Sequence, residues 1–120
     1  MEPVGAQGMT QSLAQGEPVA HVDVNTIADS LGAPLHLSGS FEIVQKFVDD
    51  VVLIDDDALR HAMGIIFYDL KMAVEPAGAA STAALLGPLK DKLQEQRVAV
   101  ITCGANIDHK TYTTLLGDAI

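Results

Sequence analysis

Two continuous apolar runs constrain the fold of this 120-residue chain more than any other feature. Val51–Ile54 follows an acidic pair, and residues 97–103 form a longer run that ends in Thr102 and Cys103. Apolar runs that lack a polar alternation are typical of strands covered on both faces in a parallel sheet. Helical patterns lie between the two runs, which predicts a right-handed crossover connection. The predicted fold class is therefore α/β, a partial parallel sheet with covering helices.

The clearest helical pattern follows Asp55–Asp57, whose carboxylates suit the amino end of a helix. Pro76 ends or kinks this helix. We expect its apolar face to comprise Leu59, Ala62, Met63, Ile66, Phe67 and Leu70. Further helices are predicted over residues 6–14, 41–48, 77–86, 89–96 and 108–116. Residues 19–24 suit a strand or an extended loop.

The chain is predicted to be one segment of a larger domain. Residues 1–40 form an irregular segment rich in Gly, Pro, Ser and Gln, and residues 41–120 form a βα segment. Two parallel strands leave both sheet edges open and cannot bury their own apolar faces. There are two explanations. Residues 17–40 could contain one or two strands that the pattern does not reveal, or the chain could contribute part of a larger sheet. We favour the second interpretation.

The charge balance argues against several classes of partner. The chain has 7 Lys+Arg against 16 Asp+Glu, a net charge of -9, which repels nucleic-acid phosphates and anionic membrane surfaces. No apolar run reaches the roughly 18–20 residues that a membrane span needs, and no secretory signal is visible. The single cysteine, Cys103, cannot form an internal disulfide. We therefore expect a cytoplasmic location, with no nucleic-acid or membrane partner.

Four short motifs occur in an order that matches a known family. They are EPVGA at residues 2–6, TIAD at 26–29, VEPAGA at 74–79 and CGANID at 103–108. Together they resemble the threonine/serine dehydratase (threonine ammonia-lyase) and serine racemase branch of the fold-type-II pyridoxal-phosphate enzymes. The resemblance covers essentially the whole chain. It implies the C-terminal portion of a tryptophan-synthase-β-like catalytic domain.

The resemblance also implies an activity. Family members eliminate the β-hydroxyl of threonine or serine and release a 2-oxo acid and ammonia, with pyridoxal phosphate held by a lysine as a Schiff base. That lysine lies in a Ser-x-Lys motif, and a glycine-rich loop holds the phosphate. Neither motif occurs here, so no catalytic residue is assigned and the chain alone is expected to be inactive. The substrate of the complete enzyme would be a small hydroxy amino acid. The protein partner would be a second copy, in a homo-oligomer, or a complementary N-terminal fragment.

Four residues are predicted, by the resemblance, to bind the cofactor. Cys103 matches a position where a Ser or Cys side chain faces the pyridine nitrogen, and Glu75 matches an acidic residue beside the ring. Gly104 and Asn106 shape the turn after Cys103. Each has a plainer alternative. Cys103 could be an inert buried thiol, Glu75 a polar residue at a helix end, and the two turn residues ordinary turn formers.

A divalent cation site is a weaker implication. Some relatives bind a cation through oxygen ligands in the Glu-Pro segment. Glu2 and the Ala6 carbonyl match two of these positions. The third, a carboxylate in the cation-binding members, is Gly8 here. Hard cations prefer several oxygen ligands, so the set is incomplete.

Two other interpretations stay open. Val51–Asp57 also resembles the first strand and acidic pair of a response-regulator receiver, but that fold needs an Asp, a Thr or Ser and a Lys at the ends of later strands, and little chain follows residue 103. The second is a non-catalytic interaction or oligomerisation module derived from the dehydratase fold. Open sheet edges and a high apolar content favour such association.

Overall fold

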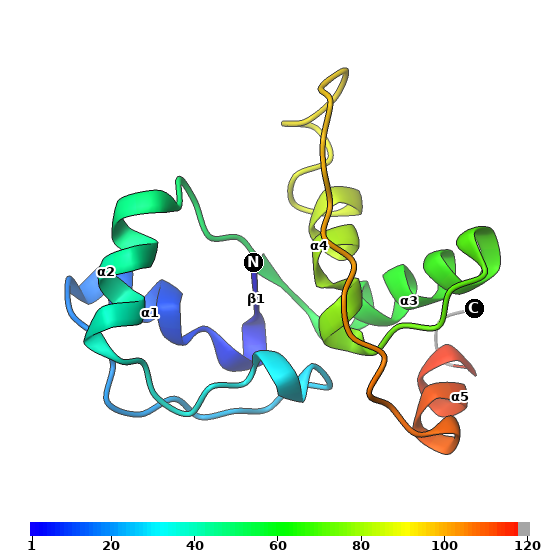
Figure 1. Cartoon of the computed structure of the whole chain (residues 1–120), viewed down its shortest axis with the longest axis horizontal. Helices are drawn as coiled ribbons and strands as arrows, with labels where there is room; N and C mark the ends of the chain where they lie inside the picture. Colours follow the sequence, from blue (N-terminus) through cyan, green and yellow to red (C-terminus); the bar gives the residue numbers. More distant parts are fainter. Residues whose placement is uncertain (118–120) are drawn as a thin grey trace.

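The computed structural model describes residues 1–117 and consists mainly of helices around one short pair of strands (Figure 1). The elements are β1 (Glu2–Pro3), η1 (Val4–Ala6), α1 (Gly8–Gln15), η2 (Asp29–Leu31), α2 (Ser38–Phe47), β2 (Leu53–Ile54), α3 (Asp56–Leu70), α4 (Pro76–Leu86) and α5 (His109–Gly117). Helices α1 and α2 pack together on one side of the strands, and α3, α4 and α5 gather on the other. The predicted βα segment extends to residue 120, and residues 118–120 lie outside the described part of the chain.

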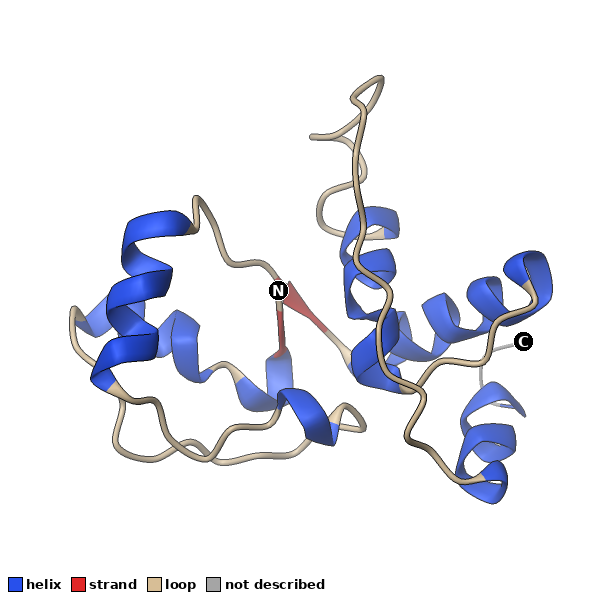
Figure 2. Cartoon of the chain, in the orientation of Figure 1, coloured by secondary structure: helices blue, strands red, loops and turns tan. Residues whose placement is uncertain are grey.

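The strands β1 and β2 form a two-stranded parallel sheet, in which Glu2 is in register with Leu53 and Pro3 with Ile54. The strand predicted in residues 51–54 is confirmed, but its predicted pairing across the crossover is wrong. Residues 97–103 run extended alongside α4 without forming a strand (Figure 2). Strand pairing needs a neighbouring backbone, and no segment within residues 1–117 supplies one to this run. No strand forms in residues 17–40 either.

The core lies between α3, α4 and α5. Four members of the predicted α3 face, Leu59, Ala62, Met63 and Ile66, are fully buried. The other two are less covered: Phe67 is 36% exposed at the edge of the core, where it packs against Tyr112, and Leu70 is 61% exposed, so the prediction is wrong for Leu70. Helix α4 begins with proline in its first turn, where the missing N–H costs nothing. Its buried alanines let it pack closely against α3.

Most helix predictions are confirmed, with shifts of a few residues at the ends. Helix α2 begins at Ser38 rather than at residue 41. Helix α1 ends at Gln15 and is followed by Gly16, which caps it in the left-handed conformation (φ 81°). The helix predicted over residues 89–96 is wrong, because residues 87–95 form only consecutive turns. Glu95 has a positive φ of 60°, which a right-handed helix excludes. Residues 19–24 form an extended loop, one of the two structures predicted for them.

Within residues 1–117 no helix has both the length and the apolar character to cross a membrane. The cytoplasmic location stays a prediction.

Candidate functional site

The turn after residue 103 lies directly on the amino end of α4. The backbone N–H of Glu75 donates to the Gly104 carbonyl at 3.1 Å. Gly78, one turn into α4, faces the Cys103 carbonyl so closely that a Cβ at position 78 would overlap it. The VEPAGA and CGANID motifs are therefore in backbone contact, although about 25 residues separate them in sequence.

Gly104 is required in this turn for two reasons. Its φ of +85° lies in the left-handed region that side chains disfavour. A Cβ on Gly104 would also overlap the Glu75 Oε1 atom. Glu75 is only 9% exposed, so its carboxylate is held against the turn and not in bulk water. The structure thus brings together Glu75 and Gly104, two of the four residues predicted to bind the cofactor.

Cys103 precedes this contact and is exposed. Within residues 1–117, therefore, this thiol is not packed into the core. The residue lines an apolar cavity of about 350 Å³, which also contacts α4 and residues 98–101. Asn106, by contrast, lines a different cavity, so the four predicted residues do not face a single pocket.

The cavity beside Asn106 has a volume of about 270 Å³ and is called here the acidic cavity. Its lining residues are Ile27, Asp29, Glu75, Pro76, Asn106, Ile107, Asp108, Thr111 and Leu115. Three carboxylates therefore border it, of which only Glu75 was predicted as a site residue. Such a lining favours a ligand that carries positive charge or N–H donors.

Asp108 borders the acidic cavity and caps α5. Its Oδ1 atom accepts hydrogen bonds from the backbone N–H groups of Lys110 at 3.0 Å and Thr111 at 3.1 Å. Hydrogen bonding from Thr111, first through its side chain and then through its backbone, lowers the pKa of Asp108 below the usual 3.8. The carboxylate is therefore ionised at neutral pH. An aspartate at the start of a predicted helix is the sequence signal that could have indicated this role.

The TIAD motif reaches the acidic cavity through a link to α3. Thr26 Oγ1 donates to Asp56 Oδ1 at 2.6 Å, and the Ile27 N–H donates to Asp56 Oδ2 at 3.1 Å. The link holds Ala28 fully buried in the core and Ile27 at the cavity wall. Asp56 thus positions a loop about 30 residues away, a role that the sequence analysis did not predict.

The residues predicted for a cation do not form a ligand set. Both carboxylate oxygens of Glu2 accept hydrogen bonds from the first turn of α1. Gly8 contributes no side chain, and within residues 1–117 no group of three His, Cys, Asp or Glu side chains could hold a metal ion. The cation prediction therefore finds no support in the geometry of this segment.

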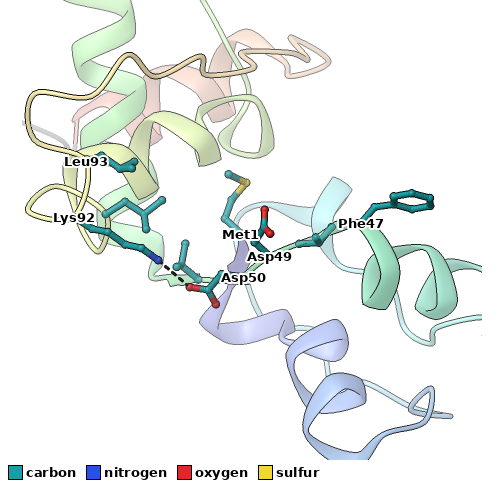
Figure 3. Close-up of a pocket in the computed structure, with 9 residues that line it drawn as sticks. Met1, Phe47, Asp49, Asp50, Lys92 and Leu93 are labelled. Carbon is teal, nitrogen blue, oxygen red and sulfur yellow. Dashed lines mark ion pairs between the residues drawn. The ribbon is translucent and has the colours of Figure 1, made fainter.

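A separate cavity of about 500 Å³ lies between the α2–β2 connection and the turns after α4 (Figure 3). Lys92 Nζ and Asp50 Oδ2 form an ion pair across it at 3.6 Å, and both side chains are more than half exposed. Such a pair contributes roughly 0–1 kcal/mol. Met1 and Leu93 line both this cavity and the apolar cavity beside Cys103, so the two cavities share an apolar wall. None of the predicted site residues lines the cavity of Figure 3.

Comparison with known proteins places these features in a family context. The phenylserine dehydratase of Ralstonia pickettii is 45% identical over 98% of this chain and 36% of its own length. The serine racemase of Dictyostelium discoideum is 34% identical over 96% of this chain and 36% of its own length. The chain spans about 36% of the length of these relatives.

Solved structures show the same backbone. The processed form of threonine deaminase isoform 2 from Solanum lycopersicum superposes with a TM-score of 0.89 at 28% identity, covering 98% of this chain and 35% of that one. Maize serine racemase gives a TM-score of 0.79 at 35% identity, covering 99% and 37%. The fold is therefore a piece of the fold-type-II architecture, with a small parallel sheet and helices. Since the family model for pyridoxal-phosphate dependent enzymes also matches residues 1–104, the chain belongs to that family.

Proposed function

We propose that this chain forms one wall of the active site of a pyridoxal-phosphate-dependent dehydratase, the wall that faces the pyridine nitrogen. The observation that carries the proposal is the turn at Cys103 and Gly104, which lies on the amino end of α4, with the Glu75 carboxylate buried against Gly104 and the Cys103 thiol exposed. A side chain at either Gly78 or Gly104 would fill this contact.

Each residue then has a defined task. The Cys103 thiol is a weak hydrogen-bond donor, so it would contact the ring nitrogen without fully protonating it. Glu75 would fix the turn and border the ring, and Gly104 would let the backbone pass close to it. When bound, the cofactor would supply an electron sink for the charge that develops at the substrate α-carbon. The residues of this chain would position the ring and set the polarity around its nitrogen.

The proposed substrates are β-hydroxy-α-amino acids, converted to a 2-oxo acid and ammonia. We propose threonine first, then serine and 3-hydroxyaspartate. The names of the relatives support this class, since they include a phenylserine dehydratase and a catabolic L-threonine dehydratase from Escherichia coli. The 45% identity to the phenylserine enzyme adds 3-phenylserine to the substrates worth testing.

We further propose that the chain alone has no dehydratase activity. Its lysines, Lys46, Lys71, Lys90, Lys92 and Lys110, match no Ser-x-Lys motif. The purified chain mixed with pyridoxal phosphate should therefore give no stoichiometric adduct that borohydride can trap. A single modified lysine, recovered in a peptide map at one equivalent, would contradict this.

The site proposal is tested by complementation. The N-terminal part of the Ralstonia phenylserine dehydratase, ending where this chain's similarity begins, would be co-expressed with the present chain, and 2-oxo acid release would be measured. We expect activity from the pair and from Cys103→Ser, and a loss of at least about tenfold from Cys103→Ala, consistent with one lost interaction of about 1.4 kcal/mol. His61→Ala, an exposed change on α3, is the matched control. Full activity of Cys103→Ala would contradict the assigned role.

The exposed apolar run at residues 98–101 supports a second candidate function, that of an interaction module. Val98 is 40% exposed, Val100 42% and Ile101 77%, and all three line the cavity beside Cys103. If residues 98–101 mediate self-assembly, analytical ultracentrifugation of the chain alone would show concentration-dependent association. The variant Ile101→Asp should abolish this association. A monomer at all concentrations would eliminate this candidate.

A further inference from the structure

The junction between β1 and α1 is held by a carboxylate placed at the amino end of the helix. Glu2 Oε1 accepts the N–H of Met9 at 2.8 Å. Glu2 Oε2 accepts both the N–H and the hydroxyl of Thr10, at 2.8 and 2.7 Å. An ionised carboxylate offers about four acceptor positions, so at most about one stays free for any other partner. The helix dipole also compensates the negative charge.

The second feature of the junction is the His36 ring, which fills the place of a side chain at residue 8. A Cβ built on Gly8 would lie 2.5 Å from His36 Nε2 and 2.6 Å from Val22 Cγ2. Gly8 itself is buried. A carboxylate at this position therefore has no room unless the imidazole moves.

The loop that carries His36 is held in place by backbone hydrogen bonds. The His36 N–H donates to the Val19 carbonyl at 3.3 Å, and the Val22 N–H donates to the Pro34 carbonyl at 2.8 Å. Ser12, fully buried on α1, donates its hydroxyl to the Gly8 carbonyl at 2.7 Å and accepts the Val19 N–H at 3.1 Å. These bonds fasten the loop that carries His36 to α1.

We propose that the β1–α1 junction is independent of divalent cations, because the hydrogen bonds to Glu2 leave at most about one of its acceptor positions free and the His36 ring fills the space that a second carboxylate, at residue 8, would need. Mg²⁺ and Ca²⁺ take six or more oxygen ligands, several of them charged in tight sites. Here the Glu2 carboxylate is already hydrogen-bonded to α1. The space beside Gly8, where a second carboxylate would lie, holds the His36 imidazole instead. The junction is thus ordered by hydrogen bonds and packing alone.

The first test measures the thermal unfolding of the full chain in EDTA and in a titration of MgCl₂, CaCl₂ or MnCl₂. The midpoint is expected to stay constant across the titration. Isothermal calorimetry with each metal salt should likewise detect no saturable binding. A saturable rise of the midpoint that Glu2→Gln removes would overturn the proposal. This readout needs neither the cofactor nor activity, so it is independent of the proposed function.

A second test rebuilds the ligand set. The variant Gly8→Asp with His36→Ala introduces a carboxylate and removes the ring that blocks it, and the Val22 methyl can yield by a rotamer change. Because an ion that binds only the folded state stabilises it, this variant is expected to show a midpoint that rises with cation concentration. The control is Gly39→Asp with His61→Ala, the same two changes at exposed positions. An identical cation response of the two variants would overturn the roles given to Gly8 and His36.

Discussion

Glu75 and Gly104 are in contact in two ways: through a 3.1 Å backbone hydrogen bond and through the Glu75 carboxylate, which lies where a side chain at position 104 would begin. The first contact fixes the turn, and the second fixes the carboxylate. Each residue therefore limits the conformations of the other. This mutual restraint keeps the exposed Cys103 in one place relative to α4.

Gly104→Ala should disturb this contact. The variant places a side chain at a φ of +85° and against the Glu75 carboxylate. Strain of this kind typically costs about 1–3 kcal/mol, so the midpoint of thermal unfolding should fall. The control is Gly39→Ala in α2, where no atom lies within 4 Å of the new methyl and where alanine should stabilise the helix by roughly 0.5–1 kcal/mol. Equal midpoints for the two variants would contradict the assigned contact.

Asp56→Asn tests the link between α3 and the TIAD loop. The change removes a charge-assisted acceptor from the Thr26 hydroxyl and the Ile27 N–H, and we expect a loss of about 1–3 kcal/mol in the free energy of unfolding. Asp57→Asn is the matched control, because Asp57 lies in the same first turn of α3 but is 93% exposed and, within residues 1–117, pairs only with Arg60. That variant should lose less than about 1 kcal/mol. Urea denaturation of both gives the comparison. A control that loses as much as Asp56→Asn would rule out a specific role for the loop link.

Tyr112→Phe should leave stability unchanged or increase it. The Tyr112 hydroxyl is buried and has no hydrogen-bond partner within residues 1–117, although the ring stacks edge-to-face with Phe67 at 5.8 Å. An unpaired buried hydroxyl costs about 1–3 kcal/mol, and phenylalanine keeps the ring while removing that cost. Tyr68→Phe, at a 47% exposed position, should have little effect. Chemical denaturation measures both, and a clear destabilisation by Tyr112→Phe would show that the hydroxyl has a partner.

Acid should weaken the cap of α5. The pKa of Asp108 is lowered by hydrogen bonds from Thr111, so its contribution to stability is present above about pH 4 and is lost as the pH falls below 3.8. Asp108→Asn should therefore reduce stability at neutral pH, and the difference from the unmodified chain should shrink in acid. Thermal unfolding at several pH values measures this difference. Asp49→Asn, which alters an exposed carboxylate outside the helices, should not reproduce the trend.

The local sequence was enough to predict the helices that position the site. The carboxylates of residues 55–57 and Pro76 mark the starts of α3 and α4, because capping and proline geometry act within one turn. The partner of β2 was not predictable in the same way. Glu2–Pro3 is only two residues long and contains a proline, so it carries no strand pattern.

The burial of residues 97–103 was also not predictable from the sequence. The run at residues 97–103 has the composition of an interior strand, yet Ile101 is 77% exposed. Composition expresses a preference for burial, whereas burial itself needs covering elements. Helix α4 lies along one side of this run, and no element within residues 1–117 covers the other side. The motifs predict Glu75, Cys103 and Gly104 as candidate site residues, and this assignment stays a prediction. The link from Asp56 to Thr26 depends on three-dimensional proximity and has no local signal.

The uncovered backbone of residues 97–103 has a consequence for how the chain behaves in a crowded solution. Val98–Ile101 is uncharged, rich in β-branched side chains and free of proline, the kind of segment that stacks with identical copies into cross-β aggregates. The lifetime of the dispersed protein should therefore depend on how soon this run is shielded, whether by another polypeptide or by a chaperone. A charge introduced at Ile101 would act as a gatekeeper against fibre formation.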